Sequence, residues 1–170
     1  MKLEKTIRDI PNFPKKGILF KDITTLLSDK TAHKKAIDML ANSVKNKKID
    51  YIVAAESRGF IFGGALAYRL GCGFVPVRKP GKLPSKTYKH TYSLEYGKDS
   101  LEMHRDAFPK GSRVLVLDDL LATGGTAGAL VKLVEKLNGK IVGVIFLIEL
   151  TDLKGRKKLN KYPIYSLIKY

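Results

Sequence analysis

The fold class is decided by the stretch Val114-Leu115-Val116-Leu117-Asp118-Asp119-Leu120-Leu121-Ala122-Thr123-Gly124-Gly125-Thr126. Its first four residues are continuously apolar, which predicts a buried strand of a parallel sheet. Beyond Thr126 apolar residues recur at helical spacing as far as Leu137, which predicts a helix. Two acids, two glycines and two threonines therefore stand between the carboxyl end of a strand and the start of a helix.

This composition is typical of a phosphate-binding loop. Glycines let the backbone turn tightly and approach an anion, while threonine hydroxyls and the free N–H groups of a helix N-terminus donate hydrogen bonds to it. The carboxylates of Asp118-Asp119 can accept hydrogen bonds from sugar hydroxyls or face a magnesium ion. A plain helix cap needs only one acid or hydroxyl. Neither G-x-x-x-x-G-K-[ST] nor G-x-G-x-x-G occurs, which argues against a P-loop or a dinucleotide-binding fold.

Strands and helices alternate on both sides of this stretch. The repetition predicts a single-domain α/β protein of residues 1–170 with a doubly wound, mostly parallel sheet. In such sheets ligands bind beyond the carboxyl ends of the strands. We expect further strands at Tyr51 to Ala55, Phe74 to Val77 and Ile141 to Leu147, one helix from about Thr31 to the Lys45 to Lys48 run, capped by Ser28 or Asp29, and another from Gly59 to near Gly71.

A separate β-hairpin is predicted between the second and third of these strands. Residues Thr87 to Tyr96 are rich in β-forming types, and Gly97-Lys98-Asp99 has the composition of a closing turn. The segment is polar enough to lie outside the main core. It can therefore form an arm beside the sheet.

The composition argues against a disordered, a collagen-like or a membrane protein. The 170 residues are 44% hydrophobic and 28% charged, close to the globular average. The net charge of +16 comes mostly from lysines spread along the chain, which predicts a solvated lysine-rich surface and no nucleic-acid partner. The longest apolar run, Ile141 to Leu150, is too short to cross a bilayer as a helix.

The start of the chain and its lone cysteine point to the cytoplasm. Residues Met1 to Asp9 mix charged and apolar types and contain no apolar core of the signal-peptide kind, so we expect a cytoplasmic protein with no membrane partner. Cys72 is the only cysteine, which rules out an intrachain disulfide and a CxxC metal site. We expect it to be a small buried thiol.

Residues Val114 to Thr126 resemble the signature of the type I phosphoribosyltransferase family for PRPP (5-phosphoribosyl-1-pyrophosphate). The similarity extends over nearly the whole chain, from Ile10 to Tyr170, and favours the adenine-specific branch. It implies that fold, with a small hood at about residues 1–28 for base recognition and a flexible arm at about residues 84–105. The segments that resemble the branch are Ile10 to Pro14, Gly17 to Thr24, Glu56 to Phe60, Arg78 to Pro84, Tyr92 to Gly97 and Glu149 to Thr151.

The resemblance implies roles for the residues that would bind PRPP. Asp118 and Asp119 would hold the ribose hydroxyls. The 5-phosphate would be bound by Ala122, Thr123, Gly124, Gly125 and Thr126. The pyrophosphate would be bound by Ser57 and Arg58 and by a second, basic group of Arg78, Lys79 and Lys82, which could act across a dimer interface. From the residues alone, Arg58 could be a surface side chain at a strand-ending turn and Lys82 a solvated lysine.

The resemblance also implies how adenine would be bound and converted. Phe20 would stack on the base while backbone groups of Leu19 and Lys21 read its amino edge; from the residues alone, Phe20 could equally belong to the core. Arg58 would be catalytic. Glu95, beside Tyr96, would handle the proton on adenine in an arm that closes as a lid, although it could also be an exposed strand residue.

The implied reaction is a Mg²⁺-dependent transfer of the 5-phosphoribosyl group from PRPP to adenine, giving AMP and pyrophosphate, by a cytoplasmic homodimer. Mg²⁺ would be held mainly by PRPP or pyrophosphate near Asp118 and Asp119, and no residue is assigned to it directly. Two alternatives stay open. One is a PRPP-binding regulator that also binds nucleic acid. The other is the same reaction with hypoxanthine or xanthine.

Overall fold

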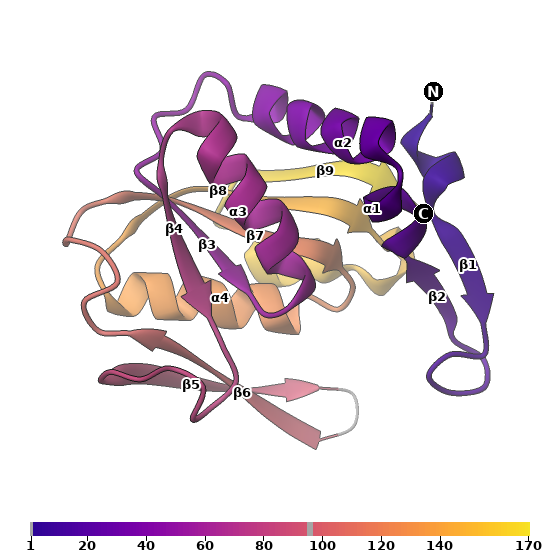
Figure 1. Ribbon diagram of the computed structural model, residues 1–170. Coiled ribbons are helices and arrows are strands. Elements are labelled where there is room, and N and C mark those ends of the chain that lie inside the picture. The colour runs from indigo at the N-terminus through magenta and orange to yellow at the C-terminus, as the bar shows by residue number, and fades with distance from the viewer. Residues whose placement is uncertain (1, 95–96) are drawn as a thin grey trace.

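A five-stranded parallel sheet forms the centre of the molecule, in the order β4-β3-β7-β8-β9 (Figure 1). The computed structural model describes residues 2–94 and 97–170. The five strands are β3 (Tyr51–Ala55), β4 (Gly73–Val77), β7 (Arg113–Leu121), β8 (Lys140–Glu149) and β9 (Ile164–Lys169), and the helices are α1 (Thr24–Ser28), α2 (Lys30–Ser43), α3 (Arg58–Leu70) and α4 (Gly125–Lys136).

Helices cover both faces of this sheet (Figure 1). On one face α2 and α3 pack against Ile52 and Leu115 of the strands, and on the other face α4 packs against Val53 and Val116. Successive strand residues point to opposite faces, so a continuously apolar strand serves both layers. The predicted doubly wound α/β fold is therefore confirmed.

The helix boundaries follow from local signals in the sequence. Asp29 caps α2, because its carboxylate accepts hydrogen bonds from the backbone N–H groups of Thr31 and Ala32. The helix α3 ends at Gly71, whose φ of 67° is left-handed and favours glycine. Both helices and the strand β3 lie where the sequence predicts them.

Two predicted boundaries are wrong. The strand β7 continues to Leu121 and so contains Asp118 and Asp119, because β8 pairs with it as far as the Leu121–Glu149 partners. In the hairpin of β5 (Thr87–Leu94) and β6 (Gly97–His104), Gly97 already pairs with Leu94. Residues 97–99 are thus strand and not a turn, and residues 95–96 lie outside the described residues.

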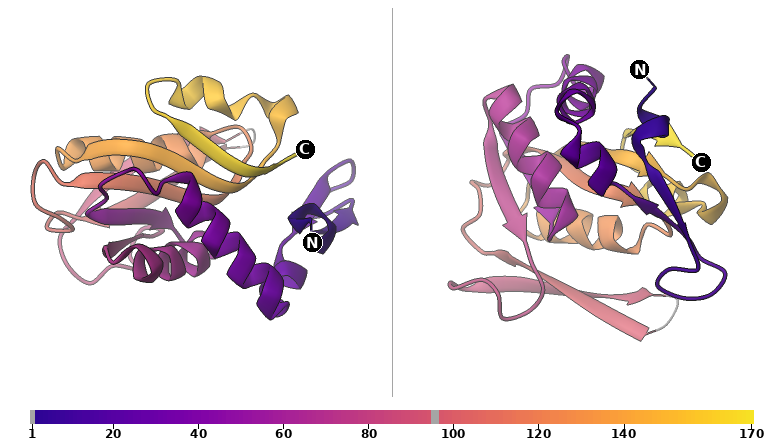
Figure 2. Two further views of the ribbon diagram at one scale, coloured as in Figure 1. Left: turned by 90° about the horizontal axis from the view of Figure 1, so that it is seen from above. Right: turned by 45° about the vertical axis from the view of Figure 1, so that its right-hand side comes forward.

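A second hairpin, not predicted from the sequence, lies within the segment predicted to be a hood, and we use that name for it. It consists of β1 (Arg8–Pro11) and β2 (Leu19–Asp22), preceded by the 3-10 helix η1 (Leu3–Thr6). Figure 2 shows it at one end of the sheet, beside the C-terminus. Its strands have only four residues each; β1 is mostly exposed, whereas β2 runs from exposed Leu19 to buried Asp22, so neither shows the alternation that identifies a strand. The division of residues 1–170 into one domain with a hood and an arm stays a prediction.

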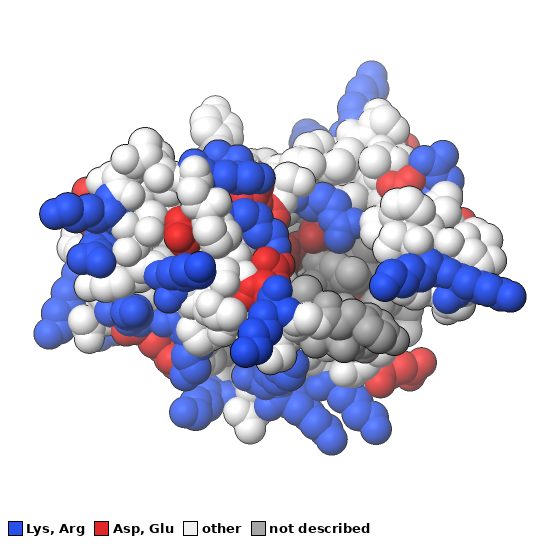
Figure 3. All heavy atoms as spheres, turned by 90° about the horizontal axis from the view of Figure 1, so that it is seen from below, with Lys and Arg blue, Asp and Glu red and all other residues white. Residues whose placement is uncertain are grey.

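The surface agrees with the expected lysine-rich character. Basic side chains in Figure 3 lie in separate groups over the face shown, with acidic side chains among them. Cys72 is half-buried, and its pKa is raised by desolvation and then by the charge of Asp50. Of the helices in the described parts of the chain, none is long and apolar enough to span a bilayer.

Candidate active site

Residues Ala122 to Thr126, called the phosphate loop after the ligand predicted for them, join the end of β7 to the start of α4. Gly124 immediately precedes α4 and has a left-handed φ of 78°. Its carbonyl accepts a hydrogen bond from the Gly128 N–H at 2.9 Å. The first N–H groups of a helix lack partners within the helix, and Gly124 has no side chain to cap them. The loop therefore places amide groups and two threonine hydroxyls at the carboxyl edge of the sheet, and phosphate binding by it stays a prediction.

Asp118 and Asp119 lie just before this loop. Asp119 is only 5% exposed, and its backbone N–H donates to Asp118 Oδ1 at 3.0 Å. Desolvation raises the pKa of the Asp118 carboxyl well above its ordinary value, and the nearby charge of Asp119 raises it further. The acid pair is consequently held in one place beside the phosphate loop.

Arg58 links the acid pair to the hood. Its Nε lies 2.9 Å from Asp119 Oδ2, and its guanidinium carbon lies 5.3 Å from the centre of the Phe20 ring. The structure thus turns Arg58 towards the acid pair and the hood, whereas the sequence associated it with pyrophosphate. Its neighbour Ser57 precedes α3, and the Ser57 side chain makes no capping hydrogen bond to that helix.

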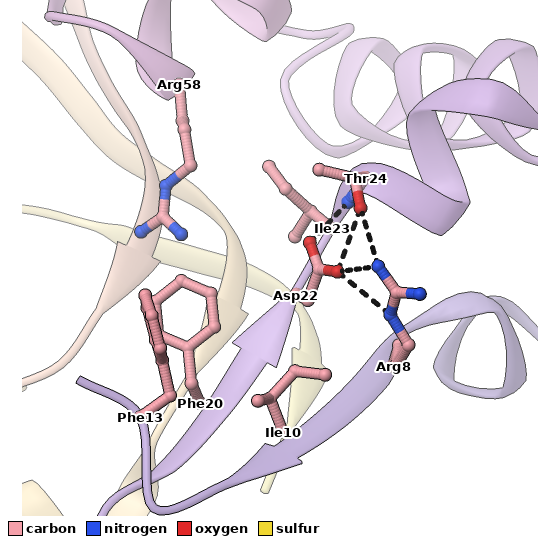
Figure 4. Close-up of a pocket in the computed structure, with 8 residues that line it drawn as sticks. All are labelled: Arg8, Ile10, Phe13, Phe20, Asp22, Ile23, Thr24 and Arg58. Atoms are coloured by element: carbon pink, nitrogen blue, oxygen red, sulfur yellow. Dashed lines mark hydrogen bonds and ion pairs between the residues drawn. The ribbon is translucent and has the colours of Figure 1, made fainter. Parts of the chain in front are cut away.

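A cavity of about 430 Å³ opens between the hood and Arg58 (Figure 4). The Phe13 and Phe20 rings meet edge to face in it, with centroids 5.0 Å apart. A mostly apolar wall with a few polar groups is typical of sites for small planar ligands. Phe20 therefore lines a cavity and is not a core residue. The lining residues are Arg8, Ile10, Phe13, Phe20, Asp22, Ile23, Thr24 and Arg58.

The other two residues predicted to read adenine surround this cavity without lining it. Leu19 is 49% exposed. The Lys21 ammonium pairs with Asp9 at 2.8 Å and lies 3.6 Å from the centre of the Tyr170 ring. These contacts hold the Lys21 side chain, so only its backbone remains for recognition of a ligand.

The polar wall of the cavity is a cluster that the sequence did not reveal. Arg8 lies opposite Asp22 in the β1–β2 pairing, and its Nε and Nη2 donate to Asp22 Oδ2 at 3.0 and 2.6 Å. Asp22 also accepts the backbone N–H of Thr24 at 2.9 Å and the Thr24 hydroxyl at 2.8 Å. Asp22 and Thr24 are near neighbours in the sequence, but Arg8 is 14 positions from Asp22, and the hairpin register brings it to them.

The cluster makes the stability of the protein depend on pH. The Thr24 N–H and then the Arg8 guanidinium lower the pKa of Asp22 from 3.8 to about 2. A depressed pKa contributes stability that is present above the unfolded value and is lost as pH falls through the folded value. We therefore expect the free energy of unfolding to fall less steeply between about pH 4 and pH 2 in Asp22→Asn than in the wild type. Urea unfolding midpoints across this range test it, and equal pH slopes for variant and wild type would contradict it.

The predicted basic group gathers around Glu56, at the end of β3. Glu56 accepts the Lys79 N–H at 2.6 Å and pairs with Lys82 Nζ at 2.8 Å and, more distantly, with Arg78 Nε at 3.5 Å. Burial opposes ionisation of this carboxyl, but the hydrogen bonds from Lys82 and Lys79 lower its pKa. Lys82 is thus ion-paired rather than simply solvated. Glu56 thus holds the basic group together, a role that was not predicted from the sequence. Its position directly before Ser57-Arg58 was the sequence feature that could have indicated this role.

The arm lies over the start of α4. The Tyr92 hydroxyl lies 3.3 Å from Asp99 Oδ2 and 3.4 Å from the Thr126 hydroxyl, and Asp99 pairs with Lys79. A Cβ on Gly125 would come within 3.3 Å of the Tyr92 ring. The arm therefore touches both the phosphate loop and the basic group. Glu95 and Tyr96 lie outside the described residues, so the role of Glu95 stays a prediction.

Comparison with known proteins agrees with this arrangement. A family model described as phosphoribosyl transferase domain matches residues 22–169. The adenine phosphoribosyltransferase of Brachyspira hyodysenteriae is 62% identical over 170 residues, which cover 100% of both chains. The chain belongs to the adenine phosphoribosyltransferase family.

Solved structures of the adenine phosphoribosyltransferase family share the fold. The enzyme from Thermoanaerobacter pseudethanolicus superposes with a TM-score of 0.97 at 60% identity, covering 99% of this chain and 98% of that one. The enzyme from Saccharomyces cerevisiae, solved in complex with D-2,5-dideoxy-2,5-imino-altritol 1,6-bisphosphate and adenine, has a TM-score of 0.91 at 47% identity, covering 97% and 96%. Membership of the family, predicted from sequence motifs, is confirmed.

Proposed function

We propose that this protein is a pentosyl-transferring glycosyltransferase of purine salvage, which converts adenine and PRPP to AMP and pyrophosphate. One observation carries the proposal: Arg58 contacts both Asp119, within the PRPP signature, and Phe20, in the hood cavity. A reaction that joins a ribose phosphate to a planar base needs both sites side by side. The single side chain of Arg58 spans them.

In this proposal the described residues hold PRPP at both of its phosphate ends. The phosphate loop binds the 5-phosphate through amide N–H groups and hydroxyls, and Asp118 and Asp119 accept hydrogen bonds from the ribose hydroxyls. Ser57 and the basic group of Arg78, Lys79 and Lys82 receive the departing pyrophosphate. Lys79 and Lys82 pair with Asp99 and Glu56, so these carboxylates would release them to the substrate.

Adenine would stack on Phe20 in the hood cavity, with backbone groups of Leu19 and Lys21 at its amino edge. A fixed backbone donor and acceptor would be left unpaired by hypoxanthine or guanine, which present a carbonyl at that edge, and an unpaired buried group costs roughly 1–3 kcal/mol. Glu95 of the arm would move the proton on the base. Arg58 would stabilise the charge that develops as the bond to pyrophosphate breaks.

The residues present fit a magnesium requirement. Mg²⁺ prefers oxygen ligands and is usually held by one or two carboxylates together with substrate phosphates. Asp118 and Asp119 supply such oxygens, and among the described residues no cluster of three His, Cys, Asp or Glu forms a closed metal cage. When bound with PRPP, Mg²⁺ would neutralise charge on the leaving pyrophosphate.

We also propose that the enzyme acts in the cytoplasm as a homodimer. PRPP is highly charged and does not cross a bilayer unaided, so its consumer is expected where it is made. On α3 the side chains of Ile61 and Tyr68 are 40% and 92% exposed, an apolar surface that a second copy could cover. Light scattering after size exclusion gives the oligomeric state, and a monomer at micromolar concentration would overturn this part of the proposal.

The proposed activity is tested with purified protein, PRPP, Mg²⁺ and a panel of adenine, hypoxanthine, guanine, xanthine and orotate, followed by spectrophotometry. We expect nucleotide from adenine. A preference for another base would retain the phosphate sites and overturn the assignment of the hood. Binding of PRPP without turnover of any base would instead favour the nucleic-acid-binding regulator.

Replacing Asp118 by Asn is expected to raise KM for PRPP about 5- to 150-fold, because the amide replaces one acceptor oxygen by an N–H donor, and a buried polar group left unpaired costs roughly 1–3 kcal/mol. KM for adenine should change much less. Initial rates at saturating levels of the other substrate measure both constants. Asp38→Asn, an exposed acid paired with Arg69, is the matched control. An unchanged KM for PRPP in Asp118→Asn would remove this residue from the PRPP site.

A further inference from the structure

We propose that Glu149 and Arg156 are positioning residues for the phosphate loop and that they act through Gly155. The inference rests on the proposed function, because it concerns the affinity of that loop for PRPP. The three residues follow the loop by more than 20 positions and lie in β8 and in the 3-10 helix η3 (Gly155–Leu159). In the proposed function none of these three residues touches PRPP or adenine.

The first step is the fixed position of Arg156. Its Nε and Nη2 donate to the two carboxylate oxygens of Glu149 at 2.5 and 2.7 Å, so the pair is bidentate. Glu149 is only 4% exposed, and it also accepts the Ser166 hydroxyl at 2.6 Å. Hydrogen bonds from Arg156 lower the pKa of Glu149, although burial opposes this, so the carboxylate stays ionised. The guanidinium is thereby held against β8 and β9.

The second step is the contact that this anchor enforces. Gly155 lies immediately before Arg156, and its backbone rests on the backbone of the phosphate loop. A Cβ built on Gly124 would come within 2.6 Å of the Gly155 carbonyl oxygen. A Cβ on Gly155 would overlap the Ala122 carbonyl and come within 2.8 Å of Leu121 Cδ1. Two glycines thus permit backbone-to-backbone packing on the side of the loop formed by Gly124.

The third step connects the anchor to the strand that carries the loop. Glu149 is the register partner of Leu121, the last residue of β7, and the Leu150 N–H donates to the Leu121 carbonyl at 2.9 Å. Glu149 therefore constrains the phosphate loop in two ways: by its pairing with Leu121 of β7, the strand that precedes the loop, and by holding Arg156 and so the Gly155 backbone that packs on Gly124. An anion site made of backbone N–H groups depends on their directions, which this packing sets.

The decisive comparison is with an ion pair that has only a structural role. Arg113 and Asp50 form an equally bidentate pair, with Nε–Oδ2 and Nη2–Oδ1 at 3.0 and 2.6 Å, at the other end of β7. The Arg113 and Arg156 side chains are 42% and 40% exposed. Lysine at either position keeps the positive charge but cannot form the bidentate hydrogen bonds of a guanidinium.

We therefore compare Arg156→Lys with Arg113→Lys in titration calorimetry with PRPP and Mg²⁺ and in steady-state kinetics. Arg156→Lys is expected to raise Kd and KM for PRPP about tenfold or more, since displacement of a binding group by 1 Å can cost about 100-fold. Its KM for adenine should be nearly unchanged. Arg113→Lys should leave both constants for PRPP near wild type, whatever its melting temperature.

A second pair of variants tests the contact itself. Gly155→Ala should weaken PRPP binding, whereas Gly128→Ala, where an added Cβ meets nothing within 4 Å, should not. If Arg156→Lys and Gly155→Ala fold and bind PRPP like the wild type, or if Arg113→Lys weakens binding equally, the inference is overturned. If the wild-type protein itself neither binds nor uses PRPP, the proposed function fails first, and that outcome is distinct.

Discussion

Replacing Arg58 by alanine is expected to lower kcat/KM for both substrates about 100- to 1,000-fold, the usual effect of removing one preorganised charge from a reaction centre. The variant loses the cation that pairs with Asp119 Oδ2 at 2.9 Å and faces the Phe20 ring. It also leaves Asp119, which is 5% exposed, without its ionic partner and next to a second carboxylate. Steady-state kinetics with each substrate varied in turn measures the loss.

Two further variants separate this effect from a loss of folding. Arg69→Ala removes another arginine of α3, one that pairs with Asp38 at 3.2 Å and is 60% exposed, and it should keep full activity. Arg58→Lys keeps the positive charge without the planar fork and should recover only part of the rate. Near wild-type turnover in a folded Arg58→Ala protein would remove Arg58 from the reaction centre and leave it a structural partner of Asp119.

The second large effect is expected from Phe20→Ala, which should raise KM for adenine about 10- to 100-fold because stacking of a base on an aromatic side chain contributes roughly 1–3 kcal/mol. Phe20 lines the cavity between the hood and Arg58. KM for PRPP should stay near wild type, since the phosphate loop lies on a different element. Initial rates at saturating PRPP measure the effect.

Phe20→Tyr is the matched variant for this prediction. It retains the ring, and Phe20 is only partly buried, so the added hydroxyl can reach water. We expect its KM for adenine to lie close to wild type. If Phe20→Ala raises the two KM values equally, its effect is on the stability of the hood, and adenine must be bound elsewhere.

The sequence alone predicted the frame of the molecule. Tyr51 to Ala55 and Val114 to Leu117 are strands because continuous apolar runs suit a sheet covered on both faces. Asp29 and Gly71 mark helix ends because capping is a local interaction. The phosphate loop was recognisable for the same reason, since its glycines, hydroxyls and acids are adjacent in the chain.

The sequence did not predict the hood hairpin. The strands β1 and β2 have only four residues each and show no alternation of buried and exposed residues, so no periodic pattern distinguishes them from a loop. The end of β7 was placed too early because the ladder with β8, and not the local residue types, determines it. The hairpin turn was misplaced at Gly97 because glycine marks a turn only when the register agrees.

By itself the sequence determined the features that neighbouring residues encode: the strands and helices whose alternation indicates the parallel α/β frame, the acid pair, and the loop that follows it. Only the tertiary structure decided which distant groups meet. It placed Arg58 between Asp119 and Phe20, gathered the basic group on Glu56, and set Gly155 against Gly124. These contacts join residues 22 to 61 positions apart, and their geometry depends on strand register and helix packing, which arise only when the whole chain folds.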